Sequence, residues 1–200
     1  MNKAIFTTLR IRDLKPLWLE DHVERILKGA ELFKVKMDEK TVYSAVQVGL
    51  EKNNLKEARM RIILHENGSL ETTVEPFEDS EVPLKLKLKE IEISQGAHKV
   101  WPFRKHTEIK GEEIILIEKS TGFVLEGSYT NVFVKTDVGY LTPPADGKIL
   151  AGIGRKHFIE ELKNKGEIVK EVWFKADVLK ENEVILTNAL RGVIRTDQLS

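Results

Sequence analysis

Residues 149–166 read ILAGIGRKHFIEELKNKG, and this stretch decides the fold of the second half of the chain. A glycine-rich turn at residues 152–154 separates an apolar segment from a helical pattern that begins near Arg155 and that Gly166 can terminate. The start of such a helix offers free backbone N–H groups, which favour a bound anion. The same turn is also an ordinary connection into a helix, and it lacks the third glycine of the dinucleotide-binding G-x-G-x-x-G pattern.

The rest of the second half is dominated by strand patterns. LKLKLKEIEI, at residues 84–93, alternates strictly between apolar and charged residues, which predicts a half-buried strand. Further strands are predicted at EIILIE (113–118), GFVLEG (122–127), NVFVKT (131–136), IVKEVWF (168–174) and EVILTN (183–188). One clear helix among so many strands indicates a strand-rich domain.

The first half mixes strands and helices. A strand is predicted at residues 4–11, and Asp38 can cap a helix that runs to about Leu50. Between them, residues 20–33 form a helical pattern whose apolar face consists of Val23, Ile26, Leu27, Ala30 and Phe33. Arg25 projects well away from this face, on the side of His22 and Gly29.

A β-hairpin and then a domain boundary follow along the chain. The strands of the hairpin are ARMRIILH and SLETTVE, joined at Asn67-Gly68, a dipeptide that suits a tight turn. The acidic, proline-containing stretch at residues 77–83 separates the two halves. We therefore expect an α+β protein with a small α/β domain at residues 1–80 and a larger strand-rich domain at residues 83–200.

Composition narrows the function classes. The 32 basic and 32 acidic residues cancel, and no long block of like charge indicates a nucleic-acid or membrane surface. The chain has no cysteine and five scattered histidines, so no metal site is expected. No stretch approaches the roughly 20 apolar residues that span a bilayer, and the N-terminus has no apolar leader. A small-molecule ligand and a cytoplasmic location are expected.

Several short strings resemble one enzyme family in both content and order. They are FTTLR at 6–10, EDHVERIL at 20–27, FRKHT at 103–107, EGSYTNVF at 126–133, ILAGIGR at 149–155 and LTNAL at 186–190. Together they resemble the class IV aminotransferases, the fold-type IV enzymes that use pyridoxal 5'-phosphate (PLP). These include branched-chain and D-amino-acid aminotransferases and aminodeoxychorismate lyase. The resemblance implies their two-domain fold, with a pseudo-barrel as the larger domain, and a homodimer.

The resemblance also implies which residues handle the reactive part of the cofactor. Lys105 matches the lysine that holds PLP as an imine, with Lys99 and Lys110 as its nearest rivals. In a chain this rich in lysine, a solvated surface residue is the ordinary alternative. Glu126 matches the glutamate beside the pyridine nitrogen, and Asn131 the residue that shapes the loop after it. Without the SYTNVF string, Glu126 would read as a strand-end glutamate in a turn.

The cofactor phosphate would be bound from three directions. Ile153 and Gly154 would offer backbone N–H groups at the helix start, and Thr187 and Asn188 would add donors from the LTNAL string. Many family members have threonine where Gly154 stands, so one hydroxyl contact is expected to be missing. Arg25 matches the phosphate arginine of the family's H-x-x-R-L string. Its alternative is a surface arginine paired with Asp21, four residues earlier.

Arg59 and Arg61 alternate on one side of a strand, so both point the same way. They fit a substrate carboxylate, and they fit the solvent face of the hairpin equally well.

The chain also departs from the family pattern. The family's first strand and G-D-G turn have no counterpart ahead of Phe6, and the segment after Lys105 is shorter than usual. Ile109 and Lys110 stand where branched-chain enzymes carry a tyrosine, which weakens that assignment. The FTT and TNAL strings favour aminodeoxychorismate lyase, an enzyme of folate biosynthesis that releases pyruvate and 4-aminobenzoate. An aminotransferase, or a PLP-binding protein without turnover, remain the alternatives.

Overall fold

The structure, a computed structural model, describes residues 4–79, 83–92, 100–101 and 111–197. It divides into two compact units, each with a core of its own. The first unit comprises Met1–Asp79 and Lys99–Arg104, and the second comprises Ser80–His98 and Lys105–Ser200. The sequence predicted one domain boundary, at residues 77–83, whereas the first unit also includes a second, later segment of the chain. The strand β6 (Val100–Trp101) belongs to the first unit, where it pairs with β1 (Ala4–Arg12).

The first unit contains an antiparallel sheet. Its strands are β1 (Ala4–Arg12), β2 (Lys15–Pro16), β3 (Glu57–His65), β4 (Leu70–Pro76) and β6 (Val100–Trp101). The order is β2-β1-β3-β4, and β6 also pairs with β1. The predicted hairpin is β3 and β4, in the register that sets Arg59 opposite Glu75.

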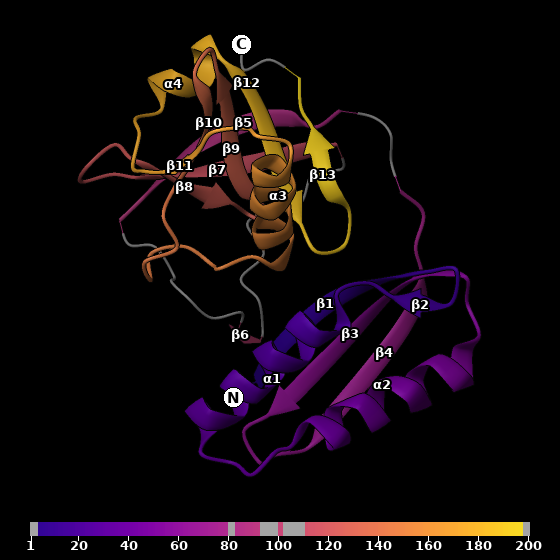
Figure 1. The fold of residues 1–200 in the computed structure, drawn as a ribbon. Helices are drawn as coiled ribbons and strands as arrows, with labels where there is room; N and C mark the ends of the chain where they lie inside the picture. The colour runs from indigo at the N-terminus through magenta and orange to yellow at the C-terminus, as the bar shows by residue number, and fades with distance from the viewer. Residues whose placement is uncertain (1–3, 80–82, 93–99, 102–110, 198–200) are drawn as a thin grey trace. The chain divides into compact units, whose positions relative to one another are not determined.

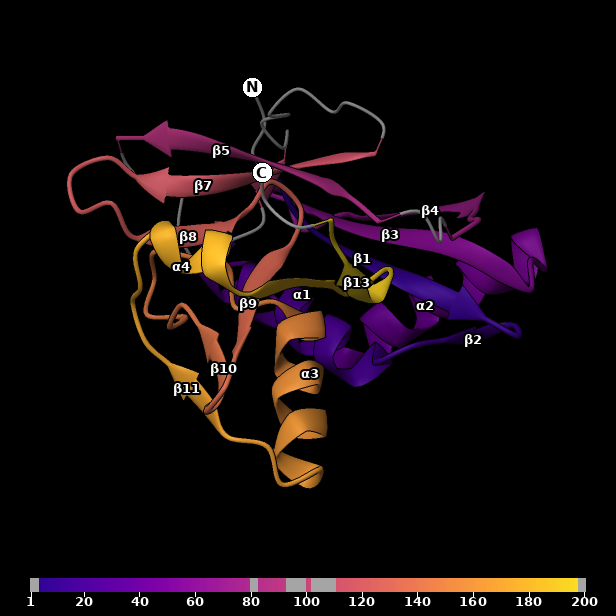
Figure 2. The same ribbon diagram turned by 90° about the horizontal axis from the view of Figure 1, so that it is seen from above.

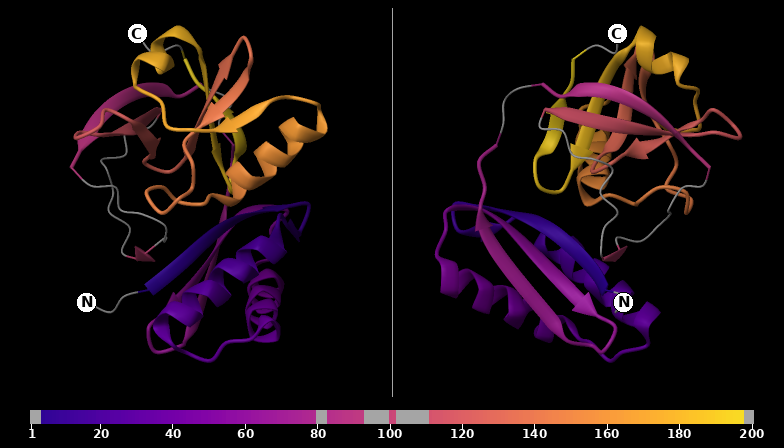
Figure 3. Two further views of the ribbon diagram at one scale, coloured as in Figure 1. Left: turned by 60° about the vertical axis from the view of Figure 1, so that its left-hand side comes forward. Right: turned by 180° about the vertical axis from the view of Figure 1, so that it is seen from behind.

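Two helices cover the same face of this sheet, α1 (Leu19–Phe33) and α2 (Glu39–Asn53) (Figures 1 and 3). Apolar residues at helical spacing on α1 meet the alternate residues of β1 and β3 that face the helices. Asp38 accepts a hydrogen bond from the Thr41 N–H at 2.8 Å, which is the predicted cap of α2. Both predicted helices are confirmed, and α2 continues past Leu50 to Asn53.

The contact face of α1 extends beyond its large apolar residues. The side that carries His22 and Gly29 is buried, because it lies against β1. Thr7 Oγ1 and His22 Nδ1 are hydrogen bonded at 2.5 Å, and both side chains are fully buried. A Cβ on Gly29 would lie 3.0 Å from Ile5. The contact face of α1 is therefore wider than its stripe of large apolar residues.

The second unit is built from two sheets and two helices. The sheet order is β11-β10-β9-β12-β13 in one and β5-β7-β8 in the other. The elements are β5 (Lys85–Ile91), β7 (Glu112–Glu118), β8 (Val124–Gly127), β9 (Asn131–Thr136), β10 (Gly139–Thr142), α3 (Ile153–Asn164), β11 (Val169–Glu171), α4 (Asp177–Glu181), β12 (Glu183–Asn188) and β13 (Gly192–Arg195). Isolated bridges join Leu84 to Thr196 and Phe123 to Lys175, so the two sheets meet at both edges as in a barrel.

The central strands of this unit are apolar on both faces. Val132 and Val134 of β9 face a core that they share with β7, whereas Phe133 between them packs on Phe158 of α3. Figure 2 shows α3 beside the five-stranded sheet. The α+β class is confirmed, with α1 and α2 on one face of the sheet in the first unit and α3 on one face of the five-stranded sheet in the second.

Details of the second unit differ from the sequence predictions. α3 begins at Ile153 rather than near Arg155, and β11 ends at Glu171, short of the predicted residue 174. β10, β13 and the short helix α4 were not predicted. Leu88 of β5 is 38% exposed, so this strand is less buried than its alternation suggests.

No helix in the described part of the chain has the length and apolar character needed to cross a membrane. Among the same residues, no group of three metal-ligating side chains comes together.

Candidate functional site

The turn between β8 and β9 presents two of the expected site residues to a third segment. Glu126 Oε2 accepts a hydrogen bond from the Leu150 N–H at 3.0 Å. Asn131 Nδ2 donates to the Leu150 carbonyl oxygen at 2.9 Å. The two ends of one turn thus hold both backbone groups of Leu150, which lies just ahead of α3.

The start of α3 is open to an anion. Its N-cap, Gly152, has no side chain to satisfy the first N–H groups, and the first turn carries no acidic residue. A Cβ on Gly152 would lie 1.9 Å from Asn131 Oδ1, so only glycine allows Asn131 to sit against this turn. Ile153 and Gly154 lie in the first helical turn, where the predicted backbone donors are needed.

The end of β12 closes on the same turn. A Cβ on Gly154 would lie 2.5 Å from the carbonyl carbon and oxygen of Asn188. Thr187 pairs directly with Asn131 across β9 and β12. The Asn188 side chain accepts hydrogen bonds from the N–H groups of Leu190 and Arg191, at 3.0 and 2.8 Å, and so shapes its own turn.

Thr187 has an unusual hydroxyl. Its side chain is fully buried, and Oγ1 has no hydrogen-bond partner among the described residues. Burial of a polar group without a partner costs about 1 to 3 kcal/mol, so such an atom calls for a ligand.

The carboxyl of Glu126 is buried without a positively charged side chain of the described residues to offset its charge. Burial raises the pKa of Glu126 to about 7, and the hydrogen bond from the Leu150 N–H opposes this only in part. No cationic side chain of the described residues acts on this pKa. A positively charged group placed beside the carboxyl would restore its ionised form.

The second unit therefore brings most of the expected residues together. They are Glu126, Asn131, Ile153, Gly154, Thr187 and Asn188, linked by the contacts above. Arg25, Arg59 and Arg61 belong to the first unit. Lys105, with its rivals Lys99 and Lys110, lies outside the described residues.

Arg25 is a half-buried residue of α1. Burial lowers the pKa of its guanidinium to about 10, and the charge of Asp21 opposes this shift. The Asp21 pairing considered from the sequence is thus present as an electrostatic contact. The Arg25 side chain is nevertheless more buried than that of an ordinary surface arginine.

Arg59 and Arg61 share the face of β3 that is turned away from the two helices, as predicted, because Ala58, Met60 and Ile62 face the core. Arg59 forms an ion pair with Glu75, which is the arrangement expected of a hairpin surface. The Arg61 guanidinium lies over the Phe6 ring, 5.4 Å from its centroid.

Sequence reasoning missed three contributors to this site. Leu150 takes part through its backbone, which carries no sequence signal. Glu113 lies in a predicted strand, yet its buried carboxyl contacts the β8–β9 turn. Arg155 is buried and donates from Nη2 to the Pro143 carbonyl and to Glu171, both at 2.8 Å, which ties down α3. Of the three, only Arg155 had a sequence signal, since it directly follows the Gly-Ile-Gly string that starts α3.

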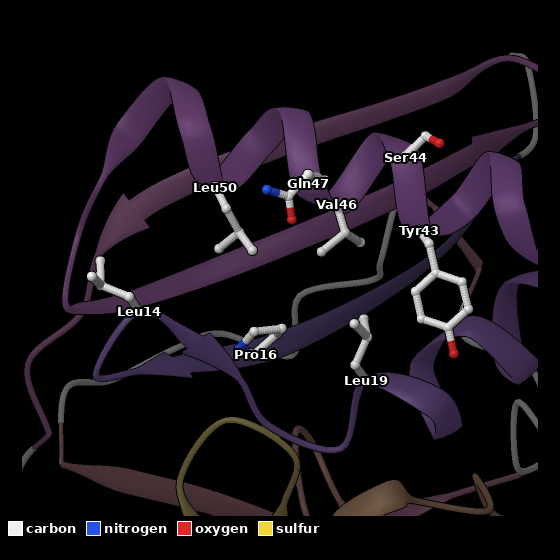
Figure 4. Close-up of a pocket in the computed structure, with 8 residues that line it drawn as sticks. All are labelled: Leu14, Pro16, Leu19, Tyr43, Ser44, Val46, Gln47 and Leu50. Atoms are coloured by element: carbon white, nitrogen blue, oxygen red, sulfur yellow. The ribbon is translucent and has the colours of Figure 1, made fainter.

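The first unit has a hollow of another kind (Figure 4). It is open, has a volume of about 500 Å³ and lies beside α2 and β2. It is lined by Leu14, Pro16, Leu19, Tyr43, Ser44, Val46, Gln47 and Leu50. These eight residues, all in the described part of the chain, carry no charged side chain, so the hollow is no substitute for the site on the second unit.

Comparisons with known proteins identify the family of the chain. The family profile described as "Amino-transferase class IV" matches residues 4–199. A Thermotoga maritima protein named "Probable branched-chain-amino-acid aminotransferase" is 25% identical over 217 residues, covering 98% of this chain and 77% of that protein.

Two solved structures share the fold. One is a Legionella pneumophila protein provisionally named 4-amino-4-deoxychorismate lyase, with a TM-score of 0.88, 18% identity and coverage of 98% of this chain and 83% of that one. The other is a hypothetical aminotransferase from Mycobacterium tuberculosis with α-ketoglutarate and PMP bound, with a TM-score of 0.84, 20% identity and coverage of 98% and 81%. Because the family profile spans nearly the whole described sequence, the chain belongs to the class IV aminotransferases, a family of PLP-dependent transaminases and lyases.

Proposed function

We propose that this protein binds PLP on its second unit and uses it on an amino-acid-like substrate. Bound PLP supplies an electron sink for the charge that develops at the substrate α-carbon. The Nζ of Lys105 would hold the cofactor, and once the substrate amine had displaced it, the freed lysine amine would take the α-proton as general base. Glu126, Asn131 and the start of α3 bind and orient the cofactor.

The donor set fits a phosphate at one end of this site. The first turn of α3 has free N–H groups at Ile153 and Gly154 and no competing carboxylate. The Thr187 hydroxyl lacks a partner, and its neighbour Asn188 lies against Gly154. A dianion bound here would satisfy groups that the described protein leaves unsatisfied.

Glu126 is the observation that carries the proposal. A buried carboxyl with its pKa raised to about 7, and with no cationic partner in the part of the chain that the structure describes, is unfavourable when ionised. A protonated pyridine nitrogen supplies the missing cation, and the pair would keep the ring electron-poor. The Leu150 N–H fixes the carboxyl in place for this contact.

We further propose that the reaction is that of aminodeoxychorismate lyase. The LTNAL string supports this reading, and so does the fold shared with the Legionella protein. The FTT string supports it less, because Thr7 lies in the core of the first unit, bonded to His22. This threonine therefore contributes to the packing of the first unit.

The named Thermotoga relative favours a second candidate, a branched-chain aminotransferase. A D-amino-acid aminotransferase, or a PLP-binding protein without turnover, are further alternatives. Incubation of the PLP-loaded protein with 4-amino-4-deoxychorismate is expected to release pyruvate and 4-aminobenzoate. Amino-group transfer from a branched-chain or D-amino acid to a keto acid would instead establish an aminotransferase. Absence of all three reactions, with PLP bound, would leave a binding protein.

Arg25→Ala is expected to weaken PLP binding by one to two orders of magnitude, because a charge-assisted phosphate contact contributes about 1.5 to 3 kcal/mol. Turnover at saturating PLP should be unchanged. Lys28→Ala is the matched control, since Lys28 is an exposed cation on the same helix, paired with Glu24. Equilibrium dialysis of PLP measures the difference. Equal affinities for the two variants would remove Arg25 from the phosphate site.

Thr187→Val is expected to have opposite effects with and without cofactor. The cofactor-free protein should be as stable as the unaltered one, or more stable, because an unpartnered buried hydroxyl is removed. PLP affinity should fall about tenfold through the loss of one hydrogen bond. Thermal unfolding with and without PLP measures both. A variant that loses stability equally in the two states would show that the hydroxyl serves the fold alone.

We also propose that the protein is a homodimer, as the family resemblance implies, and that Arg59 and Arg61 contact the substrate carboxylate. The native mass in solution tests the homodimer, since an active, PLP-loaded monomer would contradict it.

The proposed contact of Arg59 and Arg61 with the substrate carboxylate is tested by Arg61→Ala, which should raise the substrate KM more than it lowers kcat.

A further inference from the structure

A carboxyl that the proposed chemistry does not use lies inside the second unit. Glu113 of β7 is 5% exposed, and it shares a strand face with Ile115 and Ile117, which line the core between the two sheets. A carboxylate in such surroundings is costly unless donors surround it. The groups that donate hydrogen bonds to Glu113 therefore indicate its role.

The contacts all lie in the turn between β8 and β9. Glu113 Oε1 accepts from the Tyr129 N–H at 3.0 Å and from Thr130 Oγ1 at 3.2 Å. The Ser128 N–H donates instead to the Ile114 carbonyl oxygen on the same strand, at 2.9 Å. A Cβ on Gly127 would lie 2.4 Å from Oε1, so the turn is wrapped closely around the carboxyl.

This turn begins and ends at residues of the candidate site. Glu126 precedes it and Asn131 follows it, and each binds one backbone group of Leu150. The placement of both side chains thus depends on the conformation of four residues, two of which donate to Glu113.

Glu113 is also linked to the far side of the site. The positive charge of Arg191 acts on Glu113. Arg191 lies in the turn that the Asn188 side chain shapes, and the Asn188 backbone lies against Gly154. The electrostatic influence of Glu113 thus extends to both turns that flank the start of α3.

We propose that Glu113 is a positioning residue for the cofactor site, whose carboxylate fixes the β8–β9 turn and so aims Glu126 and Asn131. The inference rests on the proposed function. A merely stabilising role would lower the melting temperature and leave the cofactor environment unchanged, so the test needs readouts beyond stability.

The test compares Glu113→Gln with Glu112→Gln in the full chain. Glu112 is the neighbour on β7, and its carboxylate pairs with Lys87 at 2.8 Å. In Glu113→Gln, glutamine keeps an acceptor oxygen but loses the charge that strengthens the hydrogen bonds from the turn. In the cofactor-free protein, amide hydrogen exchange at residues 129 and 150 is therefore expected to be at least tenfold faster in Glu113→Gln and unchanged in Glu112→Gln. With PLP added, Glu113→Gln should bind at least tenfold more weakly. Its bound PLP should also show an altered pH titration of the visible absorbance.

Faster exchange spread evenly through the second unit, or an unaltered PLP absorbance titration, would overturn the proposal. Failure of the unaltered protein to bind PLP would instead overturn the proposed function. The exchange comparison would then still decide whether Glu113 fixes the turn. If Glu113→Gln does not fold, Thr130→Val removes one donor at nearly constant side-chain size. It should give the same pattern with a smaller amplitude.

Discussion

Replacing Glu126 by glutamine is expected to stabilise the cofactor-free protein at alkaline pH and to slow turnover of the PLP-loaded enzyme. Burial raises the pKa of Glu126 from its ordinary value of 4.5 to about 7. Between these pH values the folded chain binds more protons than the unfolded chain, so stability falls as pH rises through this window. Glutamine keeps the acceptor for the Leu150 N–H and removes the titration.

The stability advantage of Glu126→Gln should therefore grow by about 2 to 3 kcal/mol between pH 5 and pH 8.5. Urea unfolding of the cofactor-free proteins measures it. Glu118→Gln is a control of opposite sign, because hydrogen bonds from Thr121 and Lys148 lower the pKa of Glu118. That variant should be the less stable one at high pH. If Glu126→Gln and the unaltered protein run parallel across this range, the carboxyl is not desolvated as described.

With PLP bound, Glu126→Gln should keep the cofactor and lose at least about tenfold in turnover, because the ring nitrogen loses its ionic partner. Arg25→Ala should show the reverse pattern, with weak binding and ordinary turnover. Release of PLP by Glu126→Gln, together with a purely kinetic defect in Arg25→Ala, would show that the two roles are wrongly assigned.

Gly154→Ala is expected to damage both the fold and the site. The new Cβ would lie 2.5 Å from the backbone of Asn188, and backbone atoms cannot turn aside as a flexible side chain can. The cost should be about 1 to 3 kcal/mol, the range for overpacking in a tight interior. Separation of the two segments should also weaken PLP binding by about tenfold or more, since both carry phosphate donors.

Gly166→Ala is the matched control at the other end of α3. Gly166 has a φ of +79°, so alanine there strains the backbone, yet nothing lies within 4 Å of the added Cβ. This variant should lose stability and keep its PLP affinity. If Gly154→Ala likewise keeps full affinity, the contact with Asn188 does not shape the phosphate site. The family's usual threonine should be tolerated no better than alanine at this position in this chain.

Much of the fold could be predicted from the sequence because its signals are local. The short apolar runs of β9 and β12, the Asp38 cap and the helical pattern after Gly154 depend on neighbouring residues alone. The elements that were missed are short. β10 and β13 are formed by pairing with β9 and β12 rather than by their own patterns.

The candidate site was predictable where a string of residues forms it, and less so where distant segments meet. Glu126, Asn131, Ile153, Gly154, Thr187 and Asn188 came from strings and lie together in the second unit. Glu113 and Leu150 did not, because their roles arise from contacts between β7, the β8–β9 turn and the segment before α3. The additional buried width of α1 carried no sequence signal, because His22 and Gly29 pack without being large and apolar.

The central claim is that Lys105 carries PLP beside the site formed by Glu126 and the start of α3. Borohydride reduction of the PLP-loaded protein, followed by peptide mass analysis, tests it most directly. The account predicts a yellow protein whose visible absorbance is lost on reduction, with the phosphopyridoxyl mass on the peptide that contains Lys105. Lys105→Ala should carry no label. A label on Lys99 or Lys110, or no label on any lysine, would contradict the account.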